Sequence, residues 1–98
     1  MKIDFNKNNG ALIVALNGRL DTTTAPELDK TINEDLADVK NLVLNFRGLE
    51  YISSAGLRVL LGAQKKMQKV GTMKLVNVRE EVMEVFEMTG FADILVIE

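Results

Sequence analysis

The stretch that decides the predicted fold is YISSAGL, residues 51–57, which lies between a short apolar run and a longer pattern with helical spacing. The preceding run, LVLNF at 42–46, predicts a buried strand, so Ser53 and Ser54 fall where a central strand gives way to a helix. Side-chain oxygens are favoured there because the first backbone N–H groups of a helix have no partner within it. The same N–H groups and the aligned peptide dipoles favour negative charge. A serine at this junction is therefore either a helix cap or a place where a phosphate is added and removed.

The composition limits the class of protein. The chain has 98 residues, of which 47% are hydrophobic and 27% charged, with a formal net charge of −2. These values predict one globular domain, residues 1–98, that does not bind nucleic acid through a basic surface. Cys and His are both absent, which excludes thiolate chemistry, a Ser–His–Asp triad and the common zinc sites, so we expect neither a metal nor a cofactor. No signal region and no apolar run of about 20 residues is present, so we expect a cytoplasmic protein without membrane insertion.

Hydrophobic periodicity and turn residues predict an α/β fold with the order β-β-α-β-α-β-α-β. Asn9-Gly10 predicts a hairpin between the first two strands, 2–6 and 11–16, and Asn17-Gly18 predicts a bend or bulge after them. Strands alternating with helices predict a mixed, mostly parallel open sheet packed with helices. The remaining elements are predicted as helices over 25–37, from about 54 to Gly71, and from 77 or 78 to Gly90, and as strands over 41–46, 72–76 and 94–97.

Three finer expectations follow from single patterns. Thr24 and Glu27 have the spacing of a capping box at the start of the first helix. Gly71 is placed to end the second helix in the left-handed conformation. The apolar residues on both sides of the strand 41–46 predict that this strand is buried on both faces of the sheet.

The residue chemistry leaves several interpretations of the junction open. Ser54-Ala55-Gly56 is the second half of the hydrolase motif G-x-S-x-G, but Ile52 replaces the first glycine and no histidine exists to activate the serine, which makes an enzyme the least favoured class. A cap worth about 1 kcal/mol is the structural interpretation of Ser54. The structural interpretation of Asp21 is a turn residue that hydrogen-bonds its own loop. The structural interpretation of Gly56 is close packing of the helix against the sheet.

The stretch 49–61, LEYISSAGLRVLL, resembles the signature of the bacterial anti-sigma factor antagonists, which are STAS domains and typically carry D-S-[S/T/A]-G-L at this junction. Three further blocks agree in order and spacing, so the resemblance covers nearly the whole chain: GRLD at 18–21, LVLN at 42–45, and residues 82–90 with a Phe and a terminal Gly. The resemblance implies partner switching. The unphosphorylated protein binds an anti-sigma factor, which is usually also a GHKL-type serine kinase, and so frees the sigma factor. Phosphorylation of the motif serine, here Ser54, ends the binding, and a PP2C-like phosphatase resets the cycle.

One residue departs from that signature, because Ser53 stands where the family usually has Asp. The departure removes a negative charge and makes Ser53 a minor alternative acceptor of phosphate. The predicted docking face joins two loops with the start of the second helix, and we expect the free protein to be a monomer. Its residues are Asp21, Thr22, Ser53, Ser54, Ala55, Gly56, Leu57 and Arg58. The alternative that the resemblance leaves open is a docking subunit without a phospho-switch, in a lipid-transport ABC system or a stress-signalling scaffold.

Overall fold

Four strands form one open sheet in the order β1-β2-β3-β4, in a computed structural model that describes all 98 residues. Strand β1 (Lys2–Asn8) pairs antiparallel with β2 (Ala11–Leu20), and β3 (Asn41–Ile52) and β4 (Thr72–Val76) continue the sheet in parallel. The predicted hairpin is confirmed. Its turn residues Asn9 and Gly10 have φ angles of 47° and 83°, the consecutive positive values that a tight two-residue hairpin turn requires.

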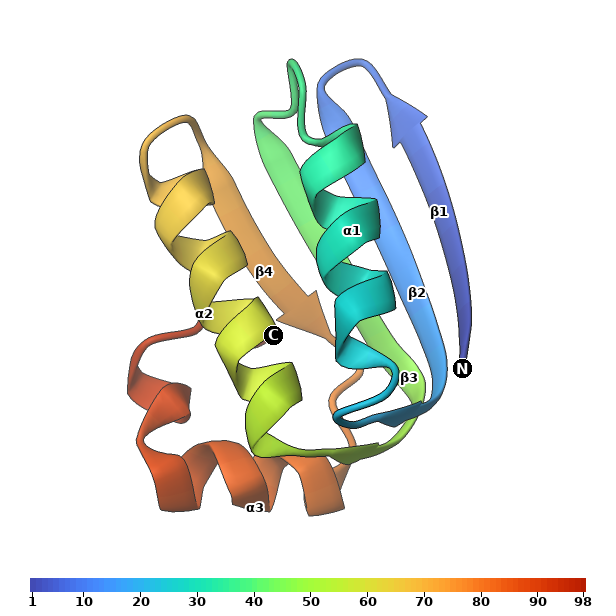
Figure 1. Ribbon diagram of the computed structural model, residues 1–98. Coiled ribbons are helices and arrows are strands. Elements are labelled where there is room, and N and C mark those ends of the chain that lie inside the picture. The colour runs from blue at the N-terminus through green and yellow to red at the C-terminus, as the bar shows by residue number, and fades with distance from the viewer.

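Helices α1 (Ala25–Asp35) and α2 (Ser54–Gln68) lie side by side against one face of the sheet, and α3 (Glu80–Thr89) runs across the end of the molecule where α2 begins (Figure 1). Alternate residues of the strands and the inner faces of the helices share one apolar core. The least exposed of its larger side chains are Phe46, Phe86, Leu12, Leu16, Leu20, Leu28, Ile32, Leu42, Leu44, Leu49, Leu60 and Met67.

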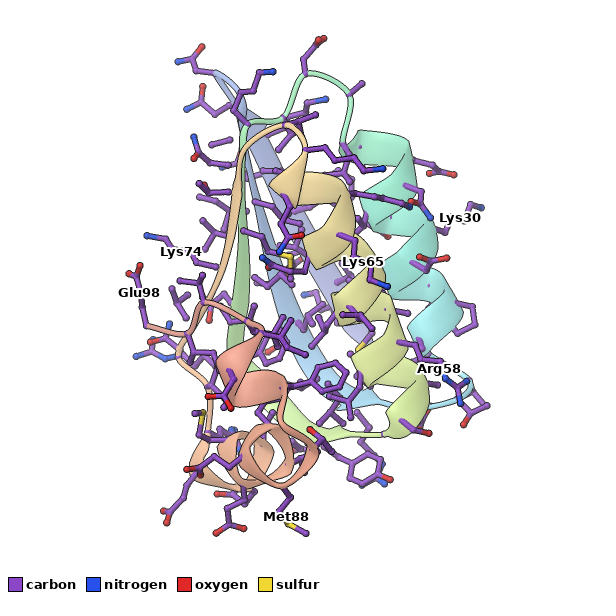
Figure 2. The ribbon with its side chains drawn as sticks, turned by 90° about the vertical axis from the view of Figure 1, so that its left-hand side faces the viewer. Lys30, Arg58, Lys65, Lys74, Met88 and Glu98 are labelled. Atoms are coloured by element: carbon purple, nitrogen blue, oxygen red, sulfur yellow. The ribbon has the colours of Figure 1, made fainter.

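The second face of the sheet is open, which makes the prediction that β3 is buried on both faces wrong. Leu42, Leu44 and Phe46 are buried, but Val43 and Asn45 between them are only half-buried. Figure 2 shows the open side, where Lys74 and Glu98 project away from the helices. The reason is topological. The chain adds β2, β3 and β4 in one direction, and right-handed crossovers between successive parallel strands then place both helices on the same face.

Strands β2 and β3 extend beyond their predicted ends at residues 16 and 46, so residues 47–52 belong to β3 and do not form a loop between the strand and the next helix. The pairing shifts register between Ala15 and Asn17 and again between Gly18 and Arg19, and each shift leaves one extra residue in β3. The bend or bulge predicted at Asn17-Gly18 corresponds to an irregularity in the pairing at these residues, but the extra residues lie in β3 and β2 continues to Leu20. Gly18 has a φ of 112° that favours glycine.

The C-terminal segment forms less structure than the strand expected at 94–97. A short 3₁₀ turn, η1 (Phe91–Asp93), is followed by a single parallel bridge in which Leu75 donates to the Val96 carbonyl and accepts from Glu98, both at 2.9 Å. Gly90 ends α3 as predicted, and the structure places it in the left-handed conformation, with a φ of 82°. Gly71 is not left-handed, and that prediction is wrong. A side chain at Gly71 would instead overlap the backbone of Lys40, which explains the glycine by close approach of two chain segments.

Candidate functional site

The junction between β3 and α2 gives its two serines different environments. Ser53 has an extended backbone (φ −101°, ψ 176°) and occupies the N-cap position, and its Oγ is buried without a hydrogen-bond partner. Ser54 is the first residue of α2 and is exposed. Neither side chain caps the helix, so the interpretation of Ser54 as a cap is wrong. The Ser54 hydroxyl is the one of the two that a second protein can reach.

The loop of Asp21 lies beside this junction. Leu20 is the register partner of Ile52, and the Ser53 N–H donates to the Leu20 carbonyl at 2.9 Å. Asp21 and Ser53 therefore follow neighbouring parallel strands directly and emerge at the same edge of the sheet. The sequence-based expectation that these two loops lie together agrees with this arrangement.

Hydrogen bonds from its own loop fix the Asp21 carboxylate. Its Oδ1 accepts from the Thr23 hydroxyl at 2.8 Å, the Thr23 N–H at 3.0 Å and the Thr24 N–H at 3.1 Å. The bond from the Thr23 hydroxyl does most to hold the pKa of Asp21 below its usual value. Partial desolvation opposes that lowering, and the N–H groups of Thr24 and Thr23 add to it. Asp21 is therefore the turn residue that the sequence suggested, and it carries a full negative charge at neutral pH.

The capping box predicted for α1 is absent. The Thr24 hydroxyl donates to the Arg19 carbonyl at 2.7 Å and accepts from the Asp21 N–H at 2.8 Å, so it is not available to the helix. No side-chain bond caps α1, and Glu27 makes none. Thr24 instead ties the loop after β2 back to the end of that strand, which stiffens the surface next to Ser54.

An arginine–tyrosine pair lies two residues before the start of each loop, and sequence reasoning missed it. Arg19 and Tyr51 are register partners, and the Arg19 guanidinium carbon lies 4.2 Å from the centre of the Tyr51 ring. This is a cation–π contact at a partly exposed site, since Tyr51 is 41% exposed. The contact could be inferred only from the parallel pairing of β2 with β3. That pairing reaches Arg19 and Tyr51 because both strands continue past their predicted ends.

The predicted docking residues divide into exposed and buried sets. Thr22, Ser54 and Arg58 are exposed, and Figure 2 shows Arg58 pointing outward from the start of α2. Asp21, Ser53 and Ala55 are half-buried, whereas Gly56 and Leu57 are buried. A Cβ on Gly56 would come within 2.8 Å of Leu20 and 2.9 Å of Ile52, as expected for close packing of helix on sheet. Gly56 and Leu57 therefore hold the helix in place beneath the exposed residues.

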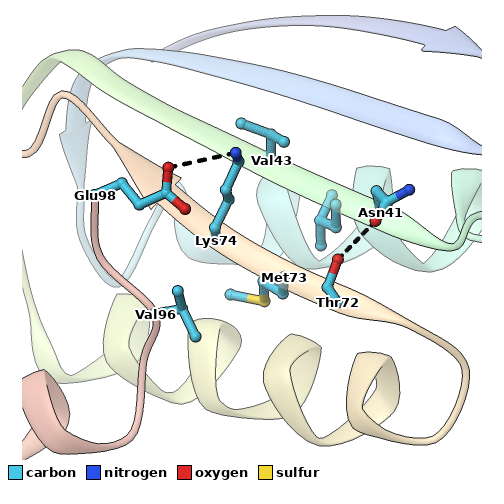
Figure 3. A pocket seen from close by; sticks show the side chains of 8 residues that line it. Asn41, Val43, Thr72, Met73, Lys74, Val96 and Glu98 are labelled. Carbon is cyan, nitrogen blue, oxygen red and sulfur yellow. Dashed lines mark hydrogen bonds and ion pairs between the residues drawn. The ribbon is translucent and has the colours of Figure 1, made fainter.

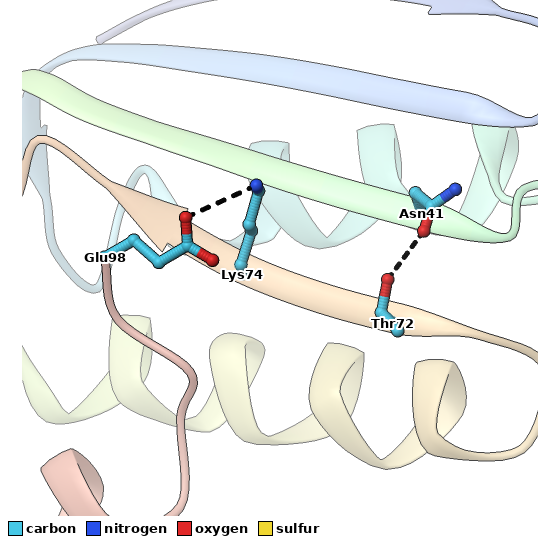
Figure 4. Close-up of polar contacts among 4 residues, drawn as sticks. All are labelled: Asn41, Thr72, Lys74 and Glu98. Carbon is cyan, nitrogen blue, oxygen red and sulfur yellow. Dashed lines mark hydrogen bonds and ion pairs between the residues drawn. The ribbon is translucent and has the colours of Figure 1, made fainter.

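The surface around Ser54 is not a small-molecule pocket. The largest hollow, of about 420 Å³, lies on the β3–β4 side, next to the C-terminal segment (Figure 3). Asn41 with Thr72, at 2.7 Å, and Lys74 with Glu98, at 3.4 Å, connect its walls (Figure 4). Neither this hollow nor the two smaller ones is lined by residues 19–24 or 51–58. No group of three or more acidic residues could hold a metal ion, and no helix is long and apolar enough to cross a bilayer. Small-molecule sites are usually concave, so an exposed surface outside the hollows is better suited to a macromolecular partner.

Comparison with known proteins agrees with the fold. A family model described as the STAS domain matches residues 2–98. The Bordetella bronchiseptica protein BtrV, named as a candidate anti-sigma factor antagonist, is 36% identical over 96 residues, which cover 96% of this chain and 83% of that protein. The anti-sigma F factor antagonist of Paenibacillus polymyxa is 31% identical over 98 residues, covering 97% of this chain and 84% of the relative. Among solved structures, Bacillus SpoIIAA aligns with a TM-score of 0.78 in its unphosphorylated form (19% identity; 99% of this chain, 87% of that one) and of 0.78 in its phosphorylated form (20% identity; 99% and 91%).

Proposed function

The chain belongs to the STAS domain family, and we propose that it is an anti-sigma factor antagonist switched by phosphorylation of Ser54. The relatives that cover almost the whole chain and carry that name support the antagonist role. In the proposal the unphosphorylated chain binds an anti-sigma factor and frees the sigma factor. The anti-sigma factor is a GHKL-type serine kinase, and a PP2C-like phosphatase reverses its action. The protein is then a monomeric, cytoplasmic docking protein and not an enzyme.

The observation that carries the switch is the contrast between the two serines. A kinase must bring the acceptor hydroxyl into line with the γ-phosphoryl group of ATP, so the hydroxyl has to be reachable. The Ser54 hydroxyl is exposed at the start of α2, whereas the Ser53 Oγ is buried. In the proposed step Ser54 Oγ gives its proton to a base of the kinase and bonds to the γ-phosphorus of ATP. The bond from that phosphorus to the β–γ bridging oxygen breaks, and ADP leaves with the bonding electrons. Ser53 accepts no phosphate in the folded chain.

The phosphate is expected to change the surface and leave the fold intact. It adds about 1.5 to 2 negative charges, and at an exposed helix N-terminus such a charge is favoured by ~0.3–1 kcal/mol. SpoIIAA, which shares the fold, has the phosphorylated form among its solved structures. The effect therefore falls on the partner. An acidic partner surface over Ser54 would meet a like charge, which costs several kcal/mol, and each ~1.4 kcal/mol weakens binding tenfold.

The docking face in this proposal consists of the exposed side chains around the acceptor. Thr22 and Arg58 flank Ser54 from the neighbouring loop and from the next turn of α2. Asp21 shapes the loop through its hydrogen bonds, and Ala55 contributes the half-buried rim. The buried residues Gly56 and Leu57 in the first turn of α2 hold this face rigid.

The test is partner capture from a lysate of the source cell, with the captured proteins identified by mass spectrometry. Wild type and Ser54→Ala should retain a GHKL-type kinase, and Ser54→Glu or a chain with phosphoserine at 54 should lose it. Ser53→Ala is the matched control, because it removes only a buried hydroxyl without a partner and should bind like wild type. Capture of transport or scaffold subunits by every one of these chains would refute the switch. It would support the alternative of a constitutive docking subunit, which is motivated by Ser53 in place of the family's Asp.

A further inference from the structure

Arg58 lies one helical turn after Ser54 on the same face of α2. Both side chains are exposed, and residues four apart on a helix have Cβ atoms about 5–6 Å from each other. Figure 2 shows the Arg58 side chain reaching outward at this end of the molecule. A phosphate on Ser54 and the guanidinium of Arg58 are therefore within reach of each other without any backbone movement.

Arg58 has no ionic partner in the unphosphorylated protein. The two ion pairs of the structure involve other residues, Lys30 with Glu34 and Lys74 with Glu98. The first turn of α2 carries no acidic side chain. The four helical neighbours of Arg58, three and four residues away on either side, are uncharged: Ser54, Ala55, Leu61 and Gly62. Only Ser54 can acquire a charge, and it does so by phosphorylation.

We propose that Arg58 binds the phosphate of phosphorylated Ser54 and is thereby withdrawn from the partner-facing surface. The inference rests on the proposed phosphorylation of Ser54. The planar guanidinium presents paired N–H donors to phosphate oxygens, a geometry that lysine cannot reproduce. Phosphorylation then alters the docking face twice. It adds an anion, and it removes the cation that Arg58 offers to an acidic partner.

The other charged groups at this edge leave Arg58 as the available cation. Arg19 is stacked on the ring of Tyr51. Asp21 and Glu50 are acidic and oppose a phosphate. Because the pKa of Asp21 is lowered, its charge stays constant while the phosphate titrates near pH 6. If replacing Arg58 changes the second pKa of the phosphate, that change therefore indicates contact between the phosphate and Arg58.

The test measures the second pKa of the phosphate by ³¹P NMR on the full chain, with phosphoserine placed at 54 during synthesis so that no kinase is needed. A bound guanidinium favours the dianion, so Arg58→Gln should raise this pKa by about 0.3–0.6 unit above wild type. Arg58→Lys should recover part of the shift, because it restores the charge without the paired donors. Lys65→Gln is the matched control. It removes one positive charge from the same helix, 11 residues from Ser54, or about 16 Å at ~1.5 Å per residue, beyond the screening length of about 8–10 Å.

The proposal fails if Arg58→Gln titrates like wild type, or if Lys65→Gln shifts the phosphate as far as Arg58→Gln does. Circular dichroism of each variant establishes that the comparison is between folded chains. The outcome is independent of partner capture. If the pKa of the phosphate depends on Arg58 but partner capture does not depend on residue 54, the contact with Arg58 stands and the proposed function is rejected. If partner capture depends on residue 54 but the pKa of the phosphate does not depend on Arg58, the proposed function stands and the contact with Arg58 is rejected.

Discussion

Replacing Gly56 with alanine should destabilise the protein, although alanine is the better helix former. The added Cβ would lie 2.8 Å from Cγ of Leu20 and 2.9 Å from Cγ1 of Ile52, closer than side-chain carbons pack. Overpacking of this kind costs about 1–3 kcal/mol, and the higher helix propensity of alanine returns up to about 1 kcal/mol. We therefore expect a net loss of about 0.5–2 kcal/mol in the free energy of unfolding.

Gly62 provides the matched control in the same helix. A Cβ at Gly62 would meet nothing within 4 Å, so Gly62→Ala should gain about 0.5–1 kcal/mol from helix propensity alone. Urea unfolding followed by far-UV circular dichroism measures both changes, and in thermal unfolding each kcal/mol corresponds to roughly 4–8 °C for a domain of this size. The two variants should move in opposite directions. A Gly56→Ala protein as stable as wild type would refute the claim that this glycine is required by close contact with the ends of β2 and β3.

Four further substitutions test other parts of the fold. Asp21 has a lowered pKa, so its charge stabilises the folded chain above its unfolded value of 3.8, and this contribution is lost as the pH falls through the folded-state pKa. On acidification from about pH 5 to 2, the melting temperature of Asp21→Asn should therefore fall less than that of wild type. The same dependence of melting temperature on pH in both proteins would contradict a hydrogen-bonded carboxylate at Asp21. Phe86→Ala, at a fully buried ring, should cost about 3–5 kcal/mol in urea unfolding, whereas Met88→Ala, at a side chain that is 86% exposed, should stay within about 0.5 kcal/mol. Gly71→Ala should cost about 2–3 kcal/mol because its Cβ overlaps the Lys40 backbone, and a neutral result would mean that the two segments separate freely.

The sequence predicted the order of elements because each has a local signal. The apolar stripe of α1, the Asn9-Gly10 turn and the left-handed Gly90 all act within a few residues. It failed where β3 continues past Phe46. Two extra residues break the alternation there, so the buried positions Phe46, Leu49 and Ile52 recur every three residues and resemble neither a strand nor a helix.

The sequence located the candidate site, but it did not predict which side chains of the site are exposed. The motif placed Ser53 and Ser54 at the junction, yet their exposure depends on where the extended backbone of β3 turns into α2, a difference of one residue. The contact of Arg19 with Tyr51 and the fit of Gly56 between two strand ends come from residues far apart in the chain. Such features need tertiary structure, since no local pattern encodes which strands are neighbours.

If the chain is phosphorylated as proposed, the burial of the Ser53 hydroxyl beside the exposed Ser54 would make the position of the phosphate a record of when it was attached. Trypsin cuts after Arg47 and Arg58 and releases one peptide that contains both Ser53 and Ser54, so its total mass does not separate the two sites. Fragment ions do. Phosphate on Ser54 is expected from a kinase that acted on the finished fold. Phosphate on Ser53 would mark molecules that were modified before the junction closed, during synthesis or after local unfolding. In a proteomic survey of the cell, the ratio of the two fragment series would then measure how often the proposed kinase acts on the unfolded chain.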